Sequence, residues 1–253
     1  GYQIPVRLSK FIIYSGPIII FTCYSSWHTE IYDFLEGAQY KVDHYNDLIL
    51  YEEGLTQKLT KLMVYFHFGK MLVESLLIHR LAGRMMPLNR TLWQILYYWV
   101  GLGCIVGYTV YHPEYKPSFL ISDLEGTQRR LFATVASVIF IAAEVLNFLC
   151  HWHFSTMEEK MAAAVIQGSQ DKKIDLASRA RKSYIVSSIS KFAILKDHGF
   201  SLVTCADWMW ELLVWVCISS IVQTMSAYVF LGIWFVWHNS KARERHWRYI
   251  AEY

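Results

Sequence analysis

The sequence lacks several patterns that would point directly to a function. It contains no Gly-x-Gly-x-x-Gly pattern and no P-loop, so a dinucleotide that binds here must do so without a Rossmann fold. It has no internal repeat and no low-complexity tract. Only 18% of its residues are charged and the net charge is +3, which gives no support for nucleic-acid binding.

Cysteine is also sparse. The five cysteines form no Cys-x-x-Cys pair, and all of them lie in or beside apolar stretches. This indicates small buried hydrophobic side chains rather than a disulfide framework. The sequence begins at Gly1 rather than Met and shows no signal-peptide pattern, so we expect residues upstream of it.

Apolar residues are abundant instead. Hydrophobic residues make up 54% of the chain and aromatic residues 16%, which predicts one multi-span membrane domain over residues 1–253. We expect an all-α, polytopic membrane helix bundle of about six to seven spans. Gly16-Pro17 predicts a kink or break in the first span, and Ser219-Ser220 divides the long apolar run that forms the last two. The predicted spans are 11–24, 62–79, 92–110, 131–149, 201–218 and 221–237.

The segments between these spans alternate in charge. The loop 25–58 is acidic, whereas the region 155–191 and the tail 238–253 are basic. We therefore expect the region 155–191, the basic tail and the N-terminus on one side of the membrane and the loop 25–58 on the other. Arg129 and Arg130 disagree with this alternation, because they precede the fourth span on the acidic side.

Residues 155–200 form a polar helical insertion in this interpretation. A capping-box pattern, Ser155 or Thr156 followed by Glu158 or Glu159, predicts a helix start. The stretch "QGSQDKK" then predicts a break between two helices.

Three predicted spans place polar side chains on one helix face, at i, i+3 and i+7 or at i and i+4. Charges are costly at membrane depth, so these faces predict a shared polar interior. The residues are His67, Lys70 and Glu74 in the second span, Glu144, Asn147 and His151 in the fourth, and Asp207 and Glu211 in the fifth.

The polar interior has three possible roles: a pocket for a polar ligand, a structural cluster of salt bridges and hydrogen bonds, or a metal site. The metal site has the least support, because His151 and His153 lie on opposite faces of a helix and no single helix has His-x-x-x-His spacing. Asp207 and Glu211 repel each other at i, i+4 and need a nearby cation, such as Lys70, Arg80 or the basic tail.

Basic residues gather on one predicted side of the membrane. Guanidinium groups suit phosphate because they donate paired hydrogen bonds, and the positive-inside bias is the alternative explanation. The residues are Arg80, Arg84, Arg90, Lys241, Arg243, Arg245 and Arg248.

Several motifs resemble those of the very-long-chain trans-2-enoyl-CoA reductases, within the steroid 5α-reductase family. The stretch "HFGKMLVESLLIHRLAGRMMPL", residues 67–88, resembles a family pattern of His-Tyr, Lys, Glu, His-Arg-Phe and Met-Pro-Leu. The resemblance continues through "GYQI" and "YSGP" near the start, "YYW" at 97–99, "YHPEY" at 111–115, "NFLCH" at 147–151 and "WHNSKARERHWRY" near the end. It therefore covers nearly the whole chain.

This resemblance implies a helical membrane reductase that uses NADPH in fatty acid elongation. Hydride would pass to the β-carbon of a trans-2-enoyl-CoA and a proton to the α-carbon. The cofactor would lie inside the bundle, held by polar residues of the helices and by the basic tail. The candidate cofactor-binding residues, carried over by position, are Glu74, His79, Arg80, Asn147, His151, Glu211, Lys241, Arg243 and Arg245.

Three positions depart from the family pattern. Ile13 stands where the family has Glu, and Phe68 and Trp208 stand where it has Tyr. The expected phenol is thus absent, and an indole does not donate a proton near neutral pH. Lys70 and His67 are the remaining candidates for a catalytic proton donor.

These departures leave competing functions open. One is a working reductase that binds membrane lipids and an acyl-CoA or another lipid enone, in the endoplasmic reticulum by resemblance. Another is a catalytically degenerate relative that serves as a structural or lipid-binding subunit of a larger membrane assembly, for example in the mitochondrial inner membrane. Loops 25–58 and 155–200 would then contact protein partners. A third is a steroid-type reductase with a different lipid substrate.

Overall fold

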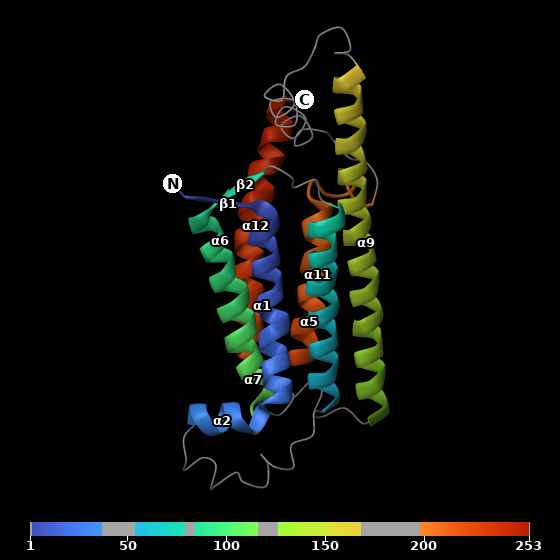
Figure 1. Ribbon diagram of the computed structural model, residues 1–253. Helices are drawn as coiled ribbons and strands as arrows, with labels where there is room; N and C mark the ends of the chain where they lie inside the picture. The colour runs from blue at the N-terminus through green and yellow to red at the C-terminus, as the bar shows by residue number, and fades with distance from the viewer. Residues whose placement is uncertain (1, 37–53, 79–83, 116–125, 168–197, 253) are drawn as a thin grey trace.

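The structure is a computed structural model that describes residues 2–36, 54–78, 84–115, 126–167 and 198–252. Helices dominate this part of the chain (Figure 1). The elements are β1 (Gln3–Pro5), α1 (Val6–Ser26), α2 (His28–Glu36), α5 (Leu55–Val73), the π-helix η1 (Glu74–Ile78), β2 (Met85–Pro87), α6 (Leu88–Ile95), the π-helix η2 (Leu96–Val106), α7 (Gly107–Tyr111), α9 (Gly126–Gln167), α11 (Ala206–Val222) and α12 (Met225–Glu252).

The helices form a bundle of rods that run side by side in alternating directions (Figure 1). The π-helices continue their neighbours, so that α5–η1 and α6–η2–α7 are each one rod. Helix α2 lies across one end of the bundle, and the C-terminal ends of α9 and α12 reach the opposite end. The predicted all-α bundle is confirmed.

A two-stranded antiparallel sheet supplements the helices at the end opposite α2 (Figure 1). β1 pairs with β2, with Ile4 opposite Met86. The backbone contacts continue beyond the strands, because Val6 N–H donates to the Arg84 carbonyl at 3.0 Å. The sheet brings "GYQI" and "MPL", two motifs far apart in the sequence, next to each other.

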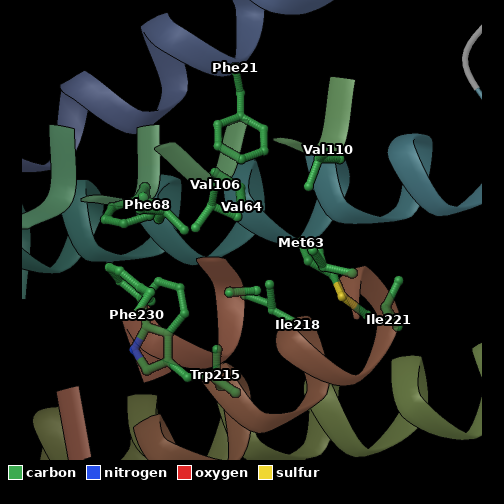
Figure 2. Close-up of a cluster of buried hydrophobic side chains, with 14 of the residues drawn as sticks. Phe21, Met63, Val64, Phe68, Val106, Val110, Trp215, Ile218, Ile221 and Phe230 are labelled. Atoms are coloured by element: carbon green, nitrogen blue, oxygen red, sulfur yellow. The ribbon is translucent and has the colours of Figure 1, made fainter. Parts of the chain in front are cut away.

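The core of the bundle lies between α1, α5, η2, α7, α11 and α12 (Figure 2). Phe68 and Trp215 lie side by side in it with ring centroids 6.1 Å apart, and Trp215 contacts Phe230 at 4.9 Å. Such large aromatic side chains contribute most to the burial of apolar surface.

The outer surface of the bundle is also apolar. Helix α9 exposes Val138 at 61% and Ile141 at 53%, and α12 exposes Val236 at 65%. So much exposed aliphatic surface is costly in water and favourable in lipid. Two described helices, Val6–Ser26 and the segment Arg130–Met157, are long and apolar enough to span a bilayer. The molecule is a membrane helix bundle, and the six-span count stays a prediction.

A kink or break was predicted at Gly16-Pro17, and the structure has no break there, because α1 continues from Val6 to Ser26 with Pro17 inside it. Proline has no N–H for the carbonyl four residues earlier, that of Ile13. The indole N–H of Trp99 supplies the donor instead, at 3.2 Å from the Ile13 oxygen. Gly16 makes room for this indole, since a Cβ there would overlap the Trp99 ring.

The predicted division at Ser219-Ser220 is also misplaced. Both serines lie inside α11, and the chain reverses at Gln223 and Thr224. Gln223 adopts the left-handed conformation with φ 51°, which ends α11. The Thr224 hydroxyl accepts the Ala227 N–H at 3.3 Å, which begins α12. Serine hydroxyls tolerate a helix because they bond its own carbonyls, as Ser220 does with Val216 at 2.7 Å.

No helix starts at Ser155 or Thr156, which corrects the capping-box prediction. Helix α9 runs unbroken from Gly126 to Gln167, so both residues are interior to it. The Thr156 hydroxyl bonds the Trp152 carbonyl at 3.0 Å, and the Ser155 hydroxyl bonds the Ile78 carbonyl at 2.7 Å. The predicted loop 25–58 contains helix α2, and the rest of it, like the region beyond Gln167, lies largely outside the described residues.

Candidate functional site

Two polar helix faces meet in the interior of the bundle. One comes from α5 and η1, and the other comes from α9. Each contact joins residues 77 positions apart in the sequence, because the two helices run in the same direction. The contacts are His67 to Glu144, Lys70 to Asn147, Glu74 to His151, and Ser155 to the carbonyl of Ile78. We call this set, together with the Lys70 ion pairs, the polar ladder.

Lys70 lies at the centre of the polar ladder. Its Nζ is 2.6 Å from Glu144 Oε2 and 3.6 Å from Glu74 Oε1, and it donates to Asn147 Oδ1 at 2.5 Å. One ammonium therefore lies between two carboxylates that are each almost fully buried. A buried charge without such a partner would destabilise the fold by several kcal/mol, roughly.

Histidines occupy both ends of the charged part of the polar ladder. His67 Nδ1 lies 2.7 Å from Glu144 Oε1, and His151 Nδ1 lies 2.6 Å from Glu74 Oε2. His67 is only 1% exposed, whereas the side chain of His151 is 15% exposed. Glu74 begins the π-helix η1, and π-turns of this kind are frequent at functional sites.

The polar ladder reaches α11 through Asn147. The Asn147 amide donates from Nδ2 to the carbonyl of Asp207 at 2.9 Å. The Asp207 carboxylate in turn lies 3.4 Å from Arg245 Nη1. The basic tail thus supplies a cation to Asp207 in the first turn of α11, as the repulsion between Asp207 and Glu211 required.

Arg245 is held on an aromatic surface at the same place. Its guanidinium lies 4.3 Å from the centre of the Trp208 ring. Trp208 meets His238 edge-on at 5.5 Å, and His238 stacks on Trp234 at 3.9 Å. Cation–π contact stabilises Arg245 in this position and leaves it 23% exposed. Burial raises the pKa of the nearby Tyr249 phenol above its usual value of 10.0.

The structure separates the predicted site residues into groups. Glu74, Asn147 and His151 come together with His67 and Lys70, and Arg245 joins them through Asp207. Lys241 is 47% exposed and pairs with Glu244, and Arg243 is exposed as well. Glu211 is buried in α11. His79 and Arg80 lie outside the described residues.

The replaced positions are filled by tight packing. Ile13 and Phe68 are both 0% exposed. Phe68 packs edge-on against Tyr98 at 5.5 Å and against His67 at 5.1 Å. A phenylalanine there closes the core without a hydroxyl.

Sequence reasoning placed Glu144 on a polar face but did not assign it to the site. The structure shows that it binds both His67 and Lys70, one through each carboxylate oxygen. Its i, i+3, i+7 spacing with Asn147 and His151 was the available signal. Among the described residues no group of His, Cys, Asp and Glu could hold a metal ion.

This arrangement fits two roles. If the polar ladder is a structural cluster, its side chains should pair with one another, as they do. The same groups form a connected series of donors and acceptors that can titrate, which suits proton transfer.

Comparisons with known proteins point to one class of enzyme. No family model matches the chain. A very-long-chain enoyl-CoA reductase from Dictyostelium discoideum is 23% identical over 250 residues, which cover 98% of this chain and 66% of that protein. A protein from Trypanosoma brucei brucei that carries the name enoyl-CoA reductase is 26% identical over 251 residues, or 99% of this chain and 67% of that protein.

A third relative, from Schizosaccharomyces pombe, carries the name enoyl reductase and is 21% identical over 257 residues. The chain thus spans about two thirds of the length of these relatives. It is similar to enoyl-CoA reductases along its whole length, and the resemblance seen in its motifs is confirmed.

Proposed function

We propose that the protein is an NADPH-dependent membrane reductase that acts on the 2,3 double bond of a trans-2-enoyl-CoA. One observation carries this proposal. The residues of the reductase-like motifs in the second and fourth spans, Lys70, Glu74, Asn147 and His151, meet in one cluster beside the start of α11. The names of three relatives supply the reaction class.

The donor set at this end of the bundle suits an anionic cofactor. Arg245 is half-enclosed by Asp207 and Trp208 and is still 23% exposed, so a phosphate can reach it. Asn147 and His151 offer amide and imidazole groups next to it. NADPH, when bound, would supply the hydride. We assign phosphate recognition to Arg245 and Lys241, and polar contacts to Asn147, His151, Glu74 and Glu211. His79, Arg80 and Arg243 complete the proposed set.

NADPH binding can be tested without turnover. A ligand that binds only the folded state raises the melting temperature, by an amount that grows with its concentration over Kd. We expect NADPH to raise the melting temperature of the protein in detergent. Arg245→Ala should reduce this rise more than Arg243→Ala, because Arg245 lies against α11 and Arg243 is exposed on the same helix.

The comparison of Arg245→Ala with Arg243→Ala separates an effect on NADPH binding from an effect on the stability of the fold. Each variant is compared with and without NADPH, so a change in its own stability cancels. Equal rises for Arg245→Ala and the unmodified protein would contradict the assignment of Arg245. No rise at all in folded, unmodified protein would contradict the cofactor.

A second candidate function is a catalytically degenerate relative that serves as a structural or lipid-binding subunit. It is favoured by Phe68 and Trp208, which carry no phenol, and by Asp207, which already pairs with Arg245. The same melting experiment decides between the two, because this candidate predicts no effect of NADPH.

A further inference from the structure

We propose that the five titratable side chains of the polar ladder carry the proton of the reduction from the surface of the bundle to its interior, with Glu144 as the relay group between Lys70 and His67. The inference rests on the proposed function, since the reduction of an enone consumes one proton for each hydride. It adds a route for that proton and a role for Glu144.

The five titratable side chains form a continuous series. Its order is His151, Glu74, Lys70, Glu144 and His67, and the successive separations are 2.6, 3.6, 2.6 and 2.7 Å. Each carboxylate uses one oxygen for a histidine and the other for Lys70. The longest separation, between Lys70 and Glu74, is bridged by the flexible lysine stem.

Exposure gives the series a direction. The side chain of His151 is 15% exposed, whereas that of His67 is 1% exposed. His151 lies one turn after Asn147, which bonds Asp207, the partner of Arg245 in the basic tail. His67 Nε2 has no hydrogen-bond partner among the described residues, although its ring contacts Phe68 and Trp215. This nitrogen is the inner end of the series, and in the proposed relay it gives the proton to the substrate.

Proton movement along the series balances. A proton taken up by His151 passes to the Glu74 carboxylate, which restores neutral imidazole. Lys70 gives a proton to Glu144 and takes the one from Glu74, so the ammonium is restored. Glu144 passes its proton to His67. NADPH, when bound, would supply the hydride for the β-carbon, and the proton that His67 gives up would complete the reduction at the α-carbon, which returns His67 to neutral imidazole.

Two neighbouring carboxylates on α11 are not part of this series among the contacts of the described residues. Asp207 pairs with Arg245, and Glu211 is buried in α11. Asn147 holds Lys70 in place but does not titrate, and it accepts a hydrogen bond from the ammonium at 2.5 Å. A purely structural contact needs no titratable group, as the bond from Ser155 to the Ile78 carbonyl in the same ladder shows.

The decisive variant is Glu144→Gln. The amide keeps the size of the side chain and can still bond His67 and Lys70, but it cannot carry a proton between them. The remaining Lys70 and Glu74 charges stay balanced, so the bundle should fold. Ser155→Ala is the matched control, because it removes a contact of the same ladder that does not titrate.

Single-turnover reduction of a trans-2-enoyl-CoA is measured in H2O and D2O, beside the rise in melting temperature with NADPH. We expect Glu144→Gln to keep the NADPH effect, to slow reduction by roughly 10²-fold, and to show a larger solvent isotope effect. Ser155→Ala should change none of these.

Other outcomes overturn the inference. If Glu144→Gln reduces substrate at the unmodified rate and with an unchanged isotope effect, the relay is wrong and the reductase assignment stands. If it slows reduction only in step with a lost NADPH effect, Glu144 is structural. If the unmodified protein neither responds to NADPH nor turns over, the reductase function and the relay both fail.

Discussion

Single residues decide whether the interior of the bundle can do acid–base chemistry. Phe68 and Trp208 hold positions where the resembling family has phenols, and each is engaged in other contacts. Phe68 is packed against Tyr98 at 5.5 Å, and Trp208 supports Arg245 at 4.3 Å. Neither side chain can donate a proton, so the proposed reductase would depend on His67 and Lys70 for it.

We therefore expect slow turnover of a trans-2-enoyl-CoA by the unmodified protein and faster turnover by Phe68→Tyr with Trp208→Tyr. Positioned acid catalysis contributes about 10²–10⁴-fold in rate, so even an imperfectly placed phenol should give a measurable gain. Phe66→Tyr with Trp237→Tyr is the control, since both side chains are exposed on the outer surface. Fast turnover that survives Lys70→Ala in the unmodified background would show that the proton donor is elsewhere.

A second feature of single residues is the hydrogen bond that replaces the one Pro17 cannot make in α1. Trp99 donates to the carbonyls of Ile12 and Ile13 at 3.1 and 3.2 Å, and Pro17 is the reason that the second carbonyl lacks a helical donor. Trp99→Phe should lower the free energy of unfolding by about 1–3 kcal/mol, because it leaves a buried acceptor unsatisfied. Chemical denaturation in mild detergent measures this loss.

The control for Trp99 is Trp93→Phe, which changes a 68% exposed side chain in the same rod. It should leave the free energy of unfolding unchanged. Equal effects of the two substitutions would mean that the indole N–H is not what keeps α1 continuous through Pro17.

At the scale of the element, the junction of α11 and α12 is set by two adjacent residues with opposite contributions. Gln223 adopts a left-handed conformation that disfavours any side chain with a Cβ. Gln223→Gly should stabilise the protein by about 1 kcal/mol, and Thr224→Ala should destabilise it by about 1 kcal/mol through loss of the cap. Unfolding midpoints of the two variants should move in opposite directions, and a common direction would contradict this turn.

Periodicity predicted where the helices are but not where they end. The predicted span 92–110 lies within the rod from Leu88 to Tyr111, and 131–149 lies within α9. The errors fall at Pro17, Ser155 and Ser219-Ser220, where a local rule was overridden. Trp99, from another rod, supplies the missing donor near Pro17. Ser155 lies inside the continuous helix α9, and Ser219 and Ser220 lie inside α11. Contacts between distant residues are invisible to a local pattern.

The polar faces were predictable in the same limited sense. The i, i+3, i+7 spacing identified both faces of the polar ladder before their partners were known. The pairing of residues 77 positions apart depends on how deeply α5 and α9 sit against each other, which packing sets. The contacts of Glu144 with both His67 and Lys70 are therefore seen only in the structure.

At the scale of the whole molecule, the directions of the helices agree with the predicted alternation of charge. Helix α2 lies at one end of the bundle, and the basic end of α12 lies at the other (Figure 1). With 28 residues, α12 is about 42 Å long, more than the roughly 30 Å hydrocarbon core of a bilayer. Its charged last turns, which contain Arg243 and Arg248, must then extend beyond the lipid on one side.

Cysteine labelling in sealed vesicles tests this arrangement. Glu30→Cys places a thiol on the exposed face of α2, and Ala251→Cys places one near the end of α12. A maleimide that cannot cross the membrane should label one of the two from outside and the other only after the vesicles are opened. Cys150, Cys205 and Cys217 are buried and should add little background, whereas Cys23 and Cys104 are not buried and are replaced by alanine before labelling. Equal labelling of both positions in intact vesicles would rule out an odd number of crossings between α2 and the basic tail, and with it their placement on opposite sides.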